Sequence, residues 1–157
     1  MADEVPDGGF PLTGGRRELD EHKACLAAVG RLEACLDRPL DDASTWLGEL
    51  RERLSELRAI LAPHFAEEAE GYLYTEVPAR APGHEAKLDR LRAEHDTILR
   101  ELDGVSAAAA RRGGLERHEL REINARAQLL VARIRRHEAE ENEIIMSSLW
   151  DDIGAAD

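Results

Sequence analysis

The chain has 157 residues, the size of about one domain, and 43% of them are hydrophobic, which is enough for a buried core. Its 33 acidic and 21 basic residues give a formal net charge of −12, so its surface repels nucleic-acid phosphates and anionic lipids. No apolar stretch approaches the roughly 18 residues of a membrane span. We therefore expect no nucleic-acid partner and no membrane partner.

The N-terminal residues are acidic and lack the apolar core of a secretory leader, which favours a cytoplasmic location. Residues 1–15 include four glycines and two prolines and show no helical pattern. They are expected to form a flexible arm, followed by one domain over residues 16–157. Cys25 and Cys35 would lie about 15 Å apart along one helix, too far apart for a disulfide bond.

Apolar residues at alternating steps of three and four predict four amphipathic helices after this arm. The first two carry Leu19, Leu26, Val29, Leu32 and Leu36, and then Leu47, Leu50, Leu54, Leu57 and Leu61. The last two carry Leu88, Leu91, Ile98, Leu102 and Val105, and then Leu120, Ile123, Ala127, Leu130, Ile134 and Ile144. Pro39, a Gly- and Pro-containing segment at 71–83, and glycines at 113–114 separate them. With no alternating pattern of a strand, the sequence predicts an all-α, antiparallel up-down-up-down four-helix bundle.

Six polar side chains interrupt these apolar stripes and are predicted to point into the bundle. They are His22, His64, Glu68, His95, His137 and Glu141. The first two histidines are 42 residues apart, as are the last two, and the second histidine of each pair precedes a glutamate by four residues. The apolar stripes around them also repeat at an offset of 73 residues. The first two predicted helices are therefore equivalent to the last two. Antiparallel packing then brings all six side chains together near one end of the core.

Buried carboxylates lose several kcal/mol of hydration, which two bound cations would compensate. A carboxylate can bridge two metals, whereas an imidazole binds one. Two bridging glutamates and two histidines per metal, with an oxo or hydroxo bridge, would leave a coordination position for a small molecule. Nitrogen and oxygen ligands without thiolate suit iron or manganese, and zinc is a further candidate.

These residues resemble the hemerythrin-like (HHE cation-binding) domain family. The resemblance rests on the motifs LDEHKACL, HFAEE, AEHDTIL and HEAEEN, and it covers nearly all of residues 16–157. It implies a four-helix bundle that holds an oxo-bridged di-iron centre. By resemblance, Glu68 and Glu141 would bridge the irons. His22 and His64 would bind one iron, and His95 and His137 the other.

Two departures from the oxygen-carrying hemerythrins disfavour reversible oxygen carriage. A fifth histidine is missing, because Leu91 and Leu99 occupy the positions one turn from His95. The last carboxylate is also a Glu four residues after its histidine, where those proteins have an Asp five residues after. Either both metals keep an open position or another carboxylate fills the gap. Glu138 is the first candidate for that carboxylate and Glu67 the second.

Tyr72, one turn beyond Glu68, is either a hydrogen-bond donor to the site or, as the favoured alternative, a packing residue. None of the six histidines in the chain follows a glutamate by three residues, which argues against a ferritin-like di-iron site.

The resemblance implies a non-haem di-iron protein that binds or senses oxygen, nitric oxide or peroxide. A redox or signalling protein would be its macromolecular partner. The alternatives are an oxidoreductase that consumes peroxide or nitric oxide, and an iron-handling protein. A metal-free helical interaction module is the least favoured interpretation.

Overall fold

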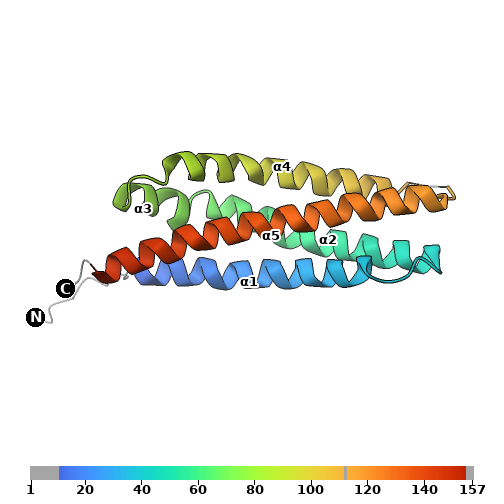
Figure 1. Ribbon diagram of the computed structural model, residues 1–157, viewed down its shortest axis with the longest axis horizontal. Coiled ribbons are helices and arrows are strands. Elements are labelled where there is room, and N and C mark those ends of the chain that lie inside the picture. Colours follow the sequence, from blue (N-terminus) through green and yellow to red (C-terminus); the bar gives the residue numbers. More distant parts are fainter. Residues whose placement is uncertain (1–10, 112, 155–157) are drawn as a thin grey trace, which may run out of the picture.

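The computed structural model describes residues 11–111 and 113–154, which form five helices and no strand (Figure 1). The helices are α1 (Pro11–Leu36), α2 (Ala43–Glu68), α3 (Tyr72–Arg80), α4 (Glu85–Ala109) and α5 (Arg117–Gly154). In the bundle of the four long helices, α1 and α4 each pack against both α2 and α5. The predicted all-α four-helix bundle is therefore confirmed. None of the described helices is long and apolar enough to cross a membrane.

The first helix begins earlier than the sequence indicated. α1 starts at Pro11, so residues 11–15, which were expected to belong to an arm, are helical, while residues 1–10 lie outside the described part. Gly14 and Gly15 are the reason for the difference. A Cβ on Gly14 would lie 3.2 Å from the Tyr72 side chain, and one on Gly15 would lie 3.0 Å from Leu149. These glycines therefore allow close helix packing rather than breaking the helix.

The segment expected only to interrupt the helical pattern contains the nine-residue helix α3. Its buried side chains are Tyr72, Leu73, Tyr74 and Val77. α3 lies at the end of the bundle where α1 begins and α5 ends (Figure 1). A helix this short is marginal by itself and shows little periodicity, so its stability comes from packing against the long helices.

The core consists of two apolar clusters on either side of a polar layer. The larger cluster extends along all four long helices and includes Leu32, Leu50, Leu102 and Leu130. The smaller cluster contains Tyr72, Leu73, Tyr74, Val77, Leu88, Leu91, Ile144, Ile145 and Leu149. The buried polar residues are Glu18, His22, His64, Glu68, His95, His137, Glu138, Glu141 and Ser148. Along each long helix the buried histidines, Glu68, Glu138 and Glu141 fall where one apolar cluster gives way to the other, whereas Ser148 lies within the smaller cluster.

The buried face of α1 differs in part from the predicted stripe. Leu19 and Leu26 are only half-buried, whereas Glu18 and Cys25 are buried. Both cysteines of the chain are free and buried, as the sequence analysis expected. The face of α1 that enters the core is therefore rotated, and it brings a carboxylate and a thiol close to His22.

Candidate metal centre

The structure brings all six predicted site residues together from four helices. α1 contributes His22, α4 contributes His95, and α2 and α5 each contribute a histidine and a glutamate. The six side chains form two groups, and the ligand atoms within each group lie within 4.8 Å of one another. The groups are His22, His64 and Glu68, and His95, His137 and Glu141. All six residues are at most 6% exposed.

The i,i+4 spacing places each glutamate directly beside the histidine of its own helix. His64 Nε2 lies 2.6 Å from Glu68 Oε2, and His137 Nε2 lies 2.8 Å from Glu141 Oε1. Both glutamates also face histidines of other helices, and Nε2 of His22 lies 3.7 Å from Glu68 Oε2 and 4.0 Å from Glu141 Oε1. On the other side, His95 Nε2 lies 3.7 Å from Glu141 Oε2. The two carboxylates therefore lie between histidines of different helices.

Many buried polar atoms of the six site residues lack hydrogen-bond partners in the described chain. The Nε2 atoms of all four histidines, both Glu68 oxygens and Glu141 Oε1 make no hydrogen bond of acceptable geometry within the described chain. Native proteins rarely leave so many buried polar atoms unsatisfied, because each costs about 1–3 kcal/mol. A set of imidazole nitrogens and carboxylate oxygens is the donor set of iron, manganese and zinc sites. The residues therefore fit bound cations.

Burial also shifts the pKa values of side chains in the site. Burial, followed by the neighbouring His22, lowers the pKa of His64 to about 4, so its imidazole is neutral and can bind a metal. Burial likewise raises the pKa of Glu68 far above its usual range and that of Glu138 to about 8. In the metal-free chain these carboxyls hold protons, so binding a cation would release them.

Comparison with protein families gives an independent result. The sequence profile of the Hemerythrin HHE cation binding domain matches residues 16–149. The chain belongs to this family. Comparisons with curated proteins and with solved structures give no significant match. Membership of the HHE family implies cation binding, and the buried histidine and glutamate groups could hold the ion.

Two further carboxylates of the HHE domain, not predicted from the sequence, lie near the Nδ1 atoms of site histidines. Glu21 approaches His64 Nδ1 at 3.5 Å, and Glu94 approaches His137 Nδ1 at 3.3 Å. Neither approach has hydrogen-bond geometry in this structure. In a metal-bound site, a carboxylate that accepts a hydrogen bond from Nδ1 fixes the tautomer that leaves Nε2 free to bind the metal. Glu21 and Glu94 are themselves 73 residues apart, so the internal repeat could have identified them.

A tyrosine of α3 contacts the site, but it is not the one that the sequence singled out. The Tyr74 hydroxyl donates a hydrogen bond to Glu141 Oε2 at 2.7 Å. The Tyr72 hydroxyl instead lies 2.9 Å from Ser148 Oγ. Glu67, the second candidate for an extra ligand, is exposed, whereas Glu138 is fully buried.

Replacing Tyr74 with phenylalanine should weaken metal retention about 10-fold, because the hydrogen bond that holds Glu141 would be lost. Competition with a chelator of known affinity measures this change. Tyr72→Phe is the matched control, since it removes a hydroxyl from the same helix that pairs with Ser148, and it should leave retention unchanged. Equal behaviour of the two variants would contradict this role of Tyr74.

Glu18 is a buried carboxylate at the edge of the polar layer. It accepts a hydrogen bond from the backbone N–H of Leu73 at 3.1 Å. Burial, and to a lesser extent the charge of Glu141, raise its pKa from 4.5 to about 7, although the hydrogen bond from Leu73 acts in the opposite direction. Since the folded chain keeps this proton up to about pH 7 and the unfolded chain loses it above about pH 4.5, Glu18 destabilises the fold increasingly as pH rises through this range.

Glu18→Gln should therefore stabilise the metal-free domain by about 2 kcal/mol at pH 8 and have little effect at pH 4. Urea unfolding of both proteins at the two pH values measures the difference. Glu122→Gln on the exposed surface of α5 is the control, with no expected change at either pH. An effect of Glu18→Gln that is independent of pH would contradict the titration of Glu18.

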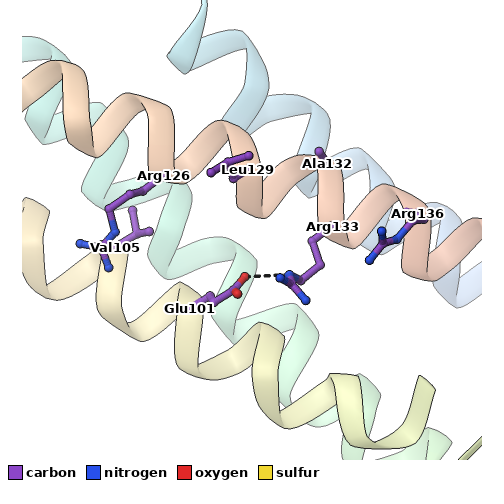
Figure 2. A pocket seen from close by; sticks show the side chains of 7 residues that line it. All are labelled: Glu101, Val105, Arg126, Leu129, Ala132, Arg133 and Arg136. Carbon is purple, nitrogen blue, oxygen red and sulfur yellow. Dashed lines mark ion pairs between the residues drawn. The ribbon is translucent and has the colours of Figure 1, made fainter. Parts of the chain in front are cut away.

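A surface hollow of about 510 Å³ lies elsewhere, between α4 and α5 (Figure 2). It is lined by Glu101, Val105, Arg126, Leu129, Ala132, Arg133 and Arg136, and it contains none of the six site residues. A smaller hollow of about 220 Å³ between α1 and α2 is lined in part by Cys25, Pro63 and His64. This second hollow reaches the polar layer at His64.

Proposed function

We propose that this HHE domain is a non-haem di-iron protein that binds or senses a small diatomic molecule or peroxide. The observation that carries the proposal is the pair of adjoining His–His–Glu groups, with Glu141 facing histidines of both. Two groups joined in this way support two metal ions that share carboxylates. His22 and His64 would hold one ion, His95 and His137 the other, and Glu68 and Glu141 would bridge them.

The donor set is compatible with iron. It combines four imidazoles with carboxylates, a set that suits iron or manganese and, on affinity, zinc. Cys25 lies close to His64, yet burial, aided by the charge of Glu138, raises the pKa of its thiol to about 12. A protonated, buried thiol is a poor metal ligand. Iron is also the metal of this set whose redox states react with oxygen, nitric oxide and peroxide.

Bound iron would supply the coordination position and the electrons for these small molecules. The chain's own residues would hold and orient the centre. Glu21 and Glu94, near the Nδ1 atoms of His64 and His137, would fix the histidine tautomers. The Tyr74 hydroxyl holds one oxygen of Glu141. The two apolar clusters keep bulk water from the polar layer.

Titration of the ferrous protein under anaerobic conditions tests this function. A spectral change that saturates at a fixed ratio of oxygen, nitric oxide or peroxide to protein, without continued consumption, is expected for binding or sensing. Continued consumption in the presence of a reductant would instead support the oxidoreductase alternative. Iron-loaded protein that responds to none of the three molecules would contradict the proposal.

A further inference from the structure

The two halves of the site repeat at an offset of 73 residues, but the residues around them do not. The histidines, the glutamates beside them and the outer glutamates all recur in both halves. Four positions near His22 or His64 break the repeat. There the pairs are Glu18 and Leu91, Cys25 and Ile98, Glu138 and Phe65, and Asn142 and Ala69. In every pair the polar member lies on the His22/His64 side.

Glu138 is the most consequential of these differences. Its side chain is fully buried, and its Oε2 lies 3.2 Å from His22 Nδ1. A carboxylate oxygen of Glu138 and one ligand atom each of His22 and Glu141 lie within 4.8 Å of one another. A second such group joins Glu138 with Cys25 and His64. Glu138 therefore lies against both histidines of this half.

Apart from the 3.2 Å approach of His22 Nδ1, the described residues provide no partner for the Glu138 carboxylate. His22 Nδ1 is already paired with Asn142 Oδ1 at 2.6 Å, so its single proton is used. Within the described residues neither Glu138 oxygen has a hydrogen bond, and no lysine or arginine pairs with it. Ionising a fully buried carboxyl group without a counter-charge is costly, and a metal cation beside it removes that cost.

The equivalent position in the other half cannot bind a metal. Phe65 stacks on His95 with ring centroids 4.1 Å apart and an angle of 7° between the ring planes. Its ring centroid also lies 5.7 Å from that of His137, in an edge-on arrangement. Leu91 and Ile98, within one turn of His95, are also buried and apolar. The His95/His137 half thus has an apolar wall where the His22/His64 half has a carboxylate.

We propose that Glu138 is a seventh protein ligand, a terminal carboxylate on the metal held by His22 and His64, so that the open position falls on the metal held by His95 and His137. The proposal rests on the di-iron function proposed above. Each metal would have five ligands: two histidines, two bridging glutamates and a solvent-derived bridge. Glu138 would be the sixth ligand of the metal held by His22 and His64. The other metal keeps its vacancy beside Phe65, where an apolar wall favours an uncharged diatomic over an anion.

Mössbauer spectra of the iron-loaded, oxidised protein test this asymmetry. The wild type should show two quadrupole doublets of equal area, one for each iron environment. In Glu138→Gln, which keeps the size of the side chain but loses its charge, the doublets should merge, or the iron of one doublet should be retained about 10-fold less tightly. Glu138→Asp, which keeps the carboxylate, should retain two doublets.

Glu140→Gln is the control, because Glu140 lies on the surface two residues away, paired with Arg90. It should leave both doublets and the iron content unchanged. Two unchanged doublets in Glu138→Gln, or a single doublet in the wild type, would overturn the role of Glu138 while leaving the di-iron function intact. A wild-type protein that retains no iron would instead refute the proposed function itself.

Discussion

Replacing Glu141 with glutamine is expected to reduce the iron retained after loading and desalting from about two ions to less than about 0.5 per chain. Glu141 is the one carboxylate that faces histidines of both groups, His137 at 2.8 Å, His95 at 3.7 Å and His22 at 4.0 Å. An amide carries no charge and cannot bridge two cations as a carboxylate does. Elemental analysis of the desalted protein measures the loss.

The control for this variant is Glu140→Gln, one residue earlier on α5, where the side chain pairs with Arg90 at the surface. Its iron content should equal that of the wild type. Circular dichroism should show that both variants keep the helical bundle. Wild-type iron content in folded Glu141→Gln would contradict a bridging role for this residue.

Iron loading should raise the Tm of the domain by at least about 8 °C. Binding to the folded state alone contributes about 4 kcal/mol per site at a free metal concentration about 1,000 times Kd. For a domain of this size, 1 kcal/mol corresponds to about 2–4 °C in Tm. The physical source is the polar layer, whose unpartnered histidine nitrogens and carboxylate oxygens gain ligand bonds.

Calorimetry of metal-free and iron-loaded protein measures this shift. Glu141→Gln serves as the control, because it should melt at nearly the same temperature with and without iron. A wild-type Tm that is unchanged at saturating iron would show that the polar layer is satisfied without metal.

The long helices could be predicted because burial of one face imposes a regular spacing on their apolar residues. Leu50, Leu54, Leu57 and Leu61 on α2 are all fully buried, as their spacing predicts. The start of α1 and the whole of α3 were not predicted, because their stability depends on tertiary packing. Gly15 suits a helix only because Leu149 packs directly against it.

The six candidate ligands could be found because each one replaces an apolar residue in a stripe. Tyr74, Glu18 and Glu138 could not be found in the same way. Tyr74 lies on α3, whose presence was not predicted, and Glu18 belongs to a face of α1 that is rotated from the predicted one. Glu138 was a candidate because it adjoins His137, but only the structure places it against His22 on a different helix.

The metal content of the chain tests the account most directly. The protein would be loaded with ferrous iron under anaerobic conditions, desalted and measured by elemental analysis. The account predicts about two iron ions per chain, one for each His–His–Glu group. A folded, stable bundle that retains almost no iron, manganese or zinc would contradict it, and the six residues would then form a polar layer in a helical interaction module.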